Sequence, residues 1–407
     1  IVGGSAEPEI LAFTSSIKTS GTSRILGSSN LTDPQTASLI NGTAGTVLEM
    51  DEGHQFARGH PGMHVFPALL AATEGTTELV SGKDFLTAFI VGYDIAARIG
   101  LATSLNANMH PHGTWGVIGA AAALGALNRL DEVQLAELLN IASSLTLATS
   151  RKTMLEGGTV RNAYTGVANQ MSHTAHKLLM AGFTGELDGI GSVFGGVVSS
   201  GFDVEAALES IGKRFEVDRN YFKLHACCRY NHAALDALWI LLDKHPELQS
   251  PGQIDRIHVE SYFLAAELDD QKPRNMLAAR FSIPFAIATT LINRSSKVHS
   301  FTGNALTDPA TLALAAKTSI SESSFMSAQL PDFRPAEVSI TMKNGQNFKA
   351  GVKTNRGDWQ DPYDNAQLKE KYISLTARRW SAKTSNTVYH NIFALDRFSN
   401  VTLAFDG

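Results

Sequence analysis

The sequence of 407 residues has few cysteines and no excess of positive charge. Its two cysteines, Cys227 and Cys228, are adjacent, so they provide no disulfide framework and favour a reducing compartment. The 34 lysines and arginines are outnumbered by 39 aspartates and glutamates, which gives a formal net charge of −5. A generic polyanion binder carries a basic excess, so we expect no nucleic acid as a partner.

Long apolar runs are also missing. No uninterrupted run approaches the roughly 20 residues that a membrane helix needs, so we expect no membrane association. The chain begins at Ile1 rather than at methionine, and no signal-peptide pattern follows. We therefore expect a cytoplasmic protein whose natural start is missing. An organellar location stays open, because a targeting peptide would have been lost with that start.

Several motifs of common enzymes are absent as well. The start Ile-Val-Gly-Gly is typical of an activated trypsin-like protease, but there is no Gly-Asp-Ser-Gly-Gly segment and no Gly-x-Ser-x-Gly elbow. The glycine-rich segment 189–196 lacks the spacing of a dinucleotide-binding loop. His-Glu-x-x-His and Cys-x-x-Cys pairs are missing too, although His110 and His112 have a spacing that could chelate an ion. We expect neither a cofactor nor a bound metal.

The first half of the chain has the pattern of helices, and the length favours two domains. Asp33 before Pro34, and Ser81 three residues before Asp84, are typical helix starts. Glycine and alanine are concentrated in 114–128, which predicts a central helix that another backbone approaches closely. The expected helices span 34–50, 64–73, 82–100, 114–128, 132–148 and 165–181, the last one closed by a C-terminal glycine.

Beyond about residue 219 the pattern changes. Residues 254–262 alternate as a strand does. Asn344-Gly345 lies between two β-prone runs, 338–342 and 348–352, and predicts a hairpin. Further helical patterns occur at 233–242, 281–293, 311–317 and 364–379.

These elements predict a mainly α protein with two domains. Residues 1–219 form a large all-helical domain, and the tail 355–407 completes it. Residues 220–354 form a smaller α+β domain.

Histidines gather in two turns, and acidic residues accompany them in the first. Asp51, Glu52, His54 and His60 follow the end of a predicted helix, where a carboxylate and imidazoles can transfer protons near neutral pH. A solvated polar turn is the simpler interpretation of this segment taken alone. The second turn, 110–114, precedes the central helix, whose dipole lowers the pKa of an imidazole there and favours a bound anion. A histidine that merely caps the helix is the alternative.

Cations lie at the starts of other predicted helices. Arg161 and Tyr164 precede one helix, Lys223 and His232 another, and Arg280 a third. None of these placements is specific by itself. Several cations that converge with imidazoles suit an anionic substrate with more than one carboxylate.

In this order, the segments resemble the MmgE/PrpD family, which includes 2-methylcitrate dehydratase, cis-aconitate decarboxylase and iminodisuccinate epimerase. The resemblance covers about residues 35 to 375. The matching segments are Asn41-Gly42-Thr43-Ala44, Asp51-Glu52, Gly59-His60-Pro61, His112-Gly113-Thr114 with Gly116, Gly182-Phe183-Thr184-Gly185, Lys223, Cys227 or Cys228, His232, Asp236-Ala237, Arg280-Phe281-Ser282 and Asp361-Pro362.

The resemblance implies a large helical domain, a smaller α+β lid, an active site between them and a homodimer. Family chains usually begin with a further helical stretch before the equivalent of Ile1. The implied catalytic residues are Asp51, His60, His112, Tyr164 and Lys223. The implied substrate-binding residues are His54, Arg161, His232 and Arg280.

Two departures from the family pattern bear on the reaction. Arg161 and Tyr164 replace a lysine and a histidine, and Glu52 stands where the family has a second aspartate. Tyr164 is a far weaker base than histidine at neutral pH. We therefore expect a cofactor-independent lyase, a dehydratase or decarboxylase, that acts on a small di- or tricarboxylic acid by proton transfer beside a carboxylate. The alternatives are an epimerase of an amino-dicarboxylate, with Tyr164 as second proton donor, and a non-catalytic carboxylate-binding protein.

Overall fold

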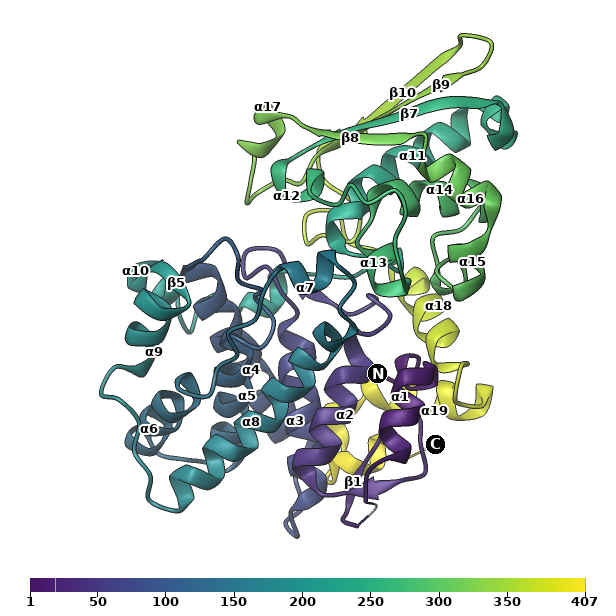
Figure 1. Ribbon diagram of the computed structural model, residues 1–407. Coiled ribbons are helices and arrows are strands. Elements are labelled where there is room, and N and C mark those ends of the chain that lie inside the picture. Colours follow the sequence, from purple (N-terminus) through teal and green to yellow (C-terminus); the bar gives the residue numbers. More distant parts are fainter. Residues whose placement is uncertain (19, 407) are drawn as a thin grey trace.

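A computed structural model describes residues 1–18 and 20–406. Figure 1 shows a helical part, which holds most of the first half of the chain, and a second part that carries the main β-sheet. The helices of the first half are α1 (Pro8–Ser15), α2 (Pro34–Thr46), α3 (Pro61–Gly75), α4 (Gly82–Ala102), α5 (Trp115–Leu127), α6 (Glu132–Ser143), α7 (Lys152–Leu155), α8 (Ala163–Met180), α9 (Gly189–Ser192) and α10 (Val204–Leu208).

Helix α5 is the centre of the helical part, as its small residues predicted. It packs against α3, α4, α6 and α8. A Cβ added to Gly119 would lie 2.4 Å from the Ala96 Cβ, so glycine is needed where α4 and α5 approach each other. The close approach predicted for this helix is confirmed.

Helix α2 begins as expected and ends earlier than expected. The Asp33 side chain accepts hydrogen bonds from the Gln35 and Thr36 amides at 3.0 and 3.1 Å, and Pro34 takes the first helical position. The predicted extension to Met50 is wrong, because α2 stops at Thr46 and Glu49 adopts a left-handed conformation with φ of 53°. This turn directs the following acidic residues into the molecule.

Three short antiparallel strand pairs tie loops together in the first part. They are β1 (Ser23–Arg24) with β2 (Leu31–Thr32), β3 (Gly53–His54) with β6 (Asn220–Tyr221), and β4 (Thr103–Leu105) with β5 (Ser199–Phe202).

The main sheet has the strand order β10-β9-β7-β8. Strands β7 (Ile254–Ser261) and β8 (Thr318–Glu322) are parallel, whereas β9 (Ala336–Met342) is antiparallel to both β7 and β10 (Asn347–Val352). The hairpin predicted at Asn344-Gly345 is confirmed, and Gly345 has φ of 88° as the turn requires. The chain between β7 and β8 contains α12 (Phe263–Ala266), α13 (Met276–Arg280), α14 (Ile283–Asn293), α15 (Gly303–Thr307) and α16 (Pro309–Ala315). Helix α17 (Ser324–Ser327) follows β8.

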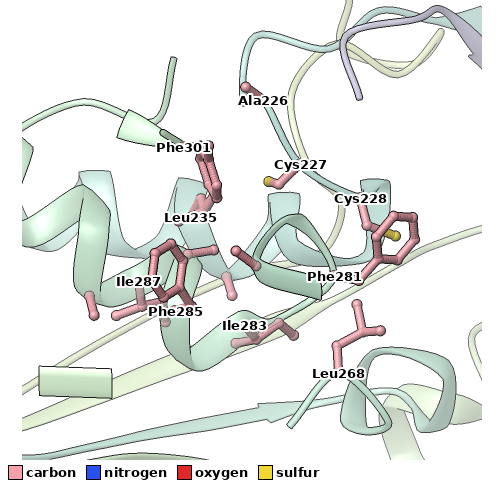
Figure 2. Packing of buried hydrophobic residues seen from close by; sticks show 14 of the residues in the cluster. Ala226, Cys227, Cys228, Leu235, Leu268, Phe281, Ile283, Phe285, Ile287 and Phe301 are labelled. Carbon is pink, nitrogen blue, oxygen red and sulfur yellow. The ribbon is translucent and has the colours of Figure 1, made fainter. Parts of the chain in front are cut away.

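One face of this sheet packs on helices. Helix α11 (His232–Lys244) contacts β9 and β10, and α14 contacts α11, α16 and β8. Figure 2 shows part of the apolar core of this layer, in which Phe285, Ile287 and Leu235 lie close to Phe301. Cys227 and Cys228 belong to the same core as free thiols, and burial raises the pKa of both.

The tail returns to the helical part. Helices α18 (Asn365–Thr376) and α19 (Ala382–Phe393) follow the sheet, and α19 lies near the N-terminus in Figure 1. Val388 of α19 shares a buried cluster with Val2 and with Val65 of α3. The sequence did not predict α19 or strand β8.

Helix α4 is long and apolar enough to cross a membrane by length and composition. However, 61% of its most apolar window is buried inside the fold, and it carries a buried ion pair between Asp94 and Arg98. These are the properties of a core helix.

The mainly α prediction is confirmed by these elements, and the division into a helical domain and a lid stays a prediction.

Candidate active site

The loops that carry the predicted site residues converge beside the strand pair β3–β6. This pair joins the turn after α2 to the segment before α11, with Gly53 opposite Tyr221. A Cβ on Gly53 would lie 2.3 Å from the Tyr221 ring, so only glycine allows the two strands to approach in this way. As a result, Lys223 reaches Asp51, although 172 positions separate them.

Four charged side chains form a buried group at this point, which we call the charge quartet: Glu49, Asp51, Arg161 and Lys223. The Lys223 Nζ donates to Asp51 Oδ1 at 2.9 Å and to Glu49 Oε2 at 3.2 Å, and Arg161 donates to the other Glu49 oxygen. Each side chain is at most 2% exposed. Burial alone would lower the pKa of Lys223, but Asp51 and Glu49 overcome it and hold that pKa above its usual range.

Glu49 was missed by the sequence analysis, and it changes the interpretation of both cations. Its left-handed backbone places its carboxylate between Arg161 and Lys223. The signal in the sequence was three acidic residues within four positions, Glu49 to Glu52, at the end of an apolar helix.

His60 is the histidine nearest to the charge quartet. Its Nδ1 lies 3.2 Å from Asp51 Oδ2 and donates a hydrogen bond to the Glu52 carbonyl oxygen. This contact assigns the proton of the neutral ring to Nδ1 and leaves Nε2 as an acceptor. Burial, with Lys223 second, lowers the pKa of His60 well below its usual value.

Three further imidazoles surround His60. The ring centroids of His60 and His112 are 4.7 Å apart, and His112 lies 4.5 Å from His110 and 5.6 Å from His64. His64 donates from Nδ1 to the His60 carbonyl and accepts the Gly113 amide at Nε2, which fixes its tautomer. Burial and the Arg161 charge lower the pKa of His112 well below its usual value, so His60 and His112 are neutral in the free protein at pH 7.

A cavity of about 60 Å³ opens on these histidines, and we call it the inner cavity. Its lining is strongly cationic and contains a single carboxylate, Glu49, among the described residues. Aromatic rings support three of its guanidinium groups, at 4.4 to 5.5 Å from the ring centroids. Both parts of the chain contribute to its five arginines, which are Arg58, Arg151, Arg161, Arg229 and Arg334.

The structure brings only some of the predicted residues to the inner cavity. His60, His112 and Arg161 line it, while Asp51 and Lys223 lie behind them in the charge quartet. Arg151 and Arg334 line it although the sequence analysis did not single them out. Both residues lie in or directly after loops that carry no recognisable motif. Only the long-range packing of the chain brings them to the cavity.

Four other predicted residues do not line the inner cavity. His54 pairs with Glu216 at 3.0 Å, His232 contacts Arg229 at 3.2 Å, and Arg280 donates to the Val47 carbonyl. The Tyr164 ring lies 5.6 Å from that of His110. His232 and Arg229 are only three positions apart, whereas the contacts of His54, Arg280 and Tyr164 each join segments that are distant in the sequence.

Glu49, Asp51 and His60 could also hold a metal ion, because one ligand atom from each lies within 4.8 Å of the others. However, the ammonium of Lys223 already occupies the space between the two carboxylates, and Arg161 neutralises Glu49 from the other side. A divalent ion there would be close to two fixed positive charges. The donor set therefore fits a metal poorly.

Glu52 is an unusual acid next to this site. Its Oε1 accepts the Gly62 amide at 2.6 Å, and its Oε2 is buried without a partner among the described residues. Burial, followed by the Asp51 charge, raises the pKa of Glu52 to about 8. Glu52 is thus protonated at neutral pH, while its backbone carbonyl orients His60.

The chain belongs to the MmgE/PrpD family. The model of the MmgE/PrpD N-terminal domain matches residues 2–203, and the model of the C-terminal domain matches residues 225–392. Similar curated proteins are a cis-aconitate decarboxylase of Aspergillus terreus, 23% identical over 414 residues, and a cis-aconitate decarboxylase of Mus musculus, 25% identical over 403 residues. The first match covers 96% of this chain and 84% of the relative, and the second covers 92% and 79%. The family and these relatives indicate a lyase of the dehydratase or decarboxylase type.

Proposed function

We propose that this protein is a cofactor-independent lyase that decarboxylates a small unsaturated tricarboxylate, with cis-aconitate as the first candidate. The observation that carries the proposal is the inner cavity, which is lined by five guanidinium groups and by the neutral imidazoles of His60 and His112. Guanidinium groups bind carboxylates in a planar, bidentate way, and imidazoles transfer protons. The names of the relatives supply the substrate candidate.

In the proposed reaction, the bond between one carboxylate and its carbon breaks, and its electron pair forms a new double bond. The electrons of the old double bond then take up a proton at the far carbon, and carbon dioxide leaves. A histidine must donate this proton. Both histidines are neutral in the free protein, but a substrate with three negative charges would raise their pKa and supply the acid form.

The charge quartet positions the acid in this proposal. Asp51 faces the Nδ1 side of His60, and Lys223 fixes Asp51. We therefore assign Lys223 a positioning role rather than direct contact with the substrate, since its ammonium is occupied by two carboxylates. The guanidinium groups lower the barrier by stabilising the charge that develops on the remaining carboxylates.

Dehydration of a hydroxy-tricarboxylate is the second candidate, because neutral imidazoles are ready to act as bases. The epimerase alternative has less support, since Tyr164 does not line the inner cavity. A homodimer also stays a proposal, and light scattering of the purified protein would test it.

Turnover of cis-aconitate in deuterated water, followed by NMR and by capture of carbon dioxide, tests the proposal. We expect one deuterium in the product for each carbon dioxide released. Loss of water from a hydroxy acid without carbon dioxide would favour the dehydratase. Proton exchange without net conversion would favour the epimerase, and binding without any turnover would favour a binding protein.

A further inference from the structure

A second cavity adjoins the inner one. It has a volume of about 220 Å³ and we call it the outer cavity. Four residues line both cavities, namely Arg58, Pro111, Arg151 and Tyr230. The outer cavity is lined by β4 and the loop after it on one side and by α12 on the other, so it lies between the helical part and the sheet-bearing part. A ligand in the outer cavity would thus be in contact with the rim of the inner one.

An ion pair spans the two parts at this shared rim. Arg151 donates to Glu267 Oε2 from Nε at 3.0 Å and from a terminal nitrogen at 2.6 Å. The Arg151 side chain is 15% exposed and the Glu267 side chain 44%. Glu267 is the only carboxylate in the lining of the outer cavity among the described residues. Glu267 is therefore the more solvated partner, which makes it the one that an incoming anion can displace.

The other guanidinium groups of the inner cavity differ in what neutralises them. Arg161 pairs with Glu49 and Arg229 with Asp358, and both pairs are buried. Among the described residues, Arg58 and Arg334 pair with no carboxylate, and their hydrogen bonds go to the backbone carbonyls of Thr103 and Gln55. Two guanidinium groups are therefore available to two substrate carboxylates without the loss of any ion pair. A third carboxylate needs a third cation, and the pair with the least burial is Arg151–Glu267.

We propose that Arg151 binds the third carboxylate of the substrate and that Glu267 competes with the substrate for this position. In the free protein Glu267 pairs with Arg151, and a tricarboxylate displaces Glu267 when it binds. A dicarboxylate binds to Arg58 and Arg334 and leaves the Arg151–Glu267 pair intact. This assignment rests on the proposed function and goes further, since it makes the Arg151–Glu267 pair the feature that distinguishes tricarboxylates from dicarboxylates.

The test compares E267Q and R151M for binding of cis-aconitate and of glutaconate, a dicarboxylate probe, by calorimetry. Loss of a charged contact corresponds to roughly a ten- to hundredfold change in Kd, so R151M should raise the Kd of cis-aconitate by about that factor. E267Q should lower the Kd of cis-aconitate, because no protein carboxylate then competes for Arg151. Neither variant should change the Kd of glutaconate.

A double variant and a matched control complete the design. R151M combined with E267Q should bind cis-aconitate as R151M does, since Glu267 acts only through Arg151. E337Q breaks a partly exposed pair of similar length, Glu337 to Lys349 at 2.7 Å on the hairpin, and should leave both affinities unchanged. If R151M fails to fold, E267Q alone still decides the question.

Unchanged cis-aconitate binding in E267Q would overturn the subsite, and so would equal effects on both ligands. If the unaltered protein neither binds nor converts any tricarboxylate, the proposed function fails and takes the subsite with it. If it converts cis-aconitate while both variants behave as the unaltered protein does, only the subsite fails.

Discussion

Replacement of Glu52 by glutamine tests whether this half-buried acid stays protonated at neutral pH. Glu52 accepts the Gly62 amide at one oxygen, and the other oxygen is buried without a partner among the described residues. Glutamine has the same shape and keeps the acceptor, but it cannot ionise. The substitution therefore removes the titration and preserves the packing.

The size of the pH effect on the free energy of unfolding follows from the pKa of Glu52, which is about 8 in the folded protein and 4.5 for the unperturbed group. Between these values the folded chain keeps a proton that the unfolded chain has lost. The free energy of unfolding therefore falls as the pH rises from about 4.5 to about 8, by roughly 1.4 kcal/mol per pH unit, and levels off above that window. The full interval corresponds to an upper limit of about 5 kcal/mol. Solvent reaches part of the residue, so we expect a loss of a few kcal/mol.

The assay is urea denaturation of the unaltered protein and of E52Q at pH 5 to 9. All other ionisable groups are common to both proteins, so the difference between the two curves isolates Glu52. E52Q should become more stable relative to the unaltered protein as the pH rises through this window. E78Q, on an exposed glutamate, is the matched control and should show no such trend. A difference between E52Q and the unaltered protein that does not vary with pH would refute the reasoning.

Three further outcomes are expected. H60Q and H112Q should each reduce turnover by roughly two to four powers of ten with an unchanged circular dichroism spectrum, and near-normal turnover in either would remove that residue from proton transfer. Dialysis against a strong chelator should leave activity unchanged, whereas loss on chelation and recovery with a divalent ion would restore the metal hypothesis. K223M should destabilise the fold by about 3–5 kcal/mol, because Asp51 loses a buried partner, while K349M at an exposed pair should cost less than about 1 kcal/mol in urea denaturation.

The fold could be predicted where local chemistry decides it. Asp33 and Pro34 start α2, Gly182 with φ of 85° follows the end of α8, and Asn344-Gly345 turns the hairpin. Each of these features depends on neighbours within a few positions. Strand β8 was missed because its pattern is not alternating and because, within the part of the chain that the structure describes, it pairs only with β7, about sixty positions earlier.

The candidate site could be predicted only in part, for the same reason. His60 and His112 precede helices, so their placement followed from local signals. The pairing of Arg161 and Lys223 with Glu49 did not, because it depends on a left-handed backbone at Glu49. Sequence reasoning therefore found the cations and not the acid that neutralises two of them.

That neutralisation decides which cations remain for a substrate. The charge quartet holds two cations and two carboxylates, so its net charge is zero and it offers little attraction to an anion. The charge quartet instead holds Asp51 in place beside His60. It can do so because a buried group in which every charge is paired is costly to rearrange. In the proposed function, the attraction for carboxylates comes instead from Arg58 and Arg334, which belong to different parts of the chain and line one cavity. The proposed function therefore assigns recognition and proton transfer to different residues, which lie together because both parts of the chain line one cavity.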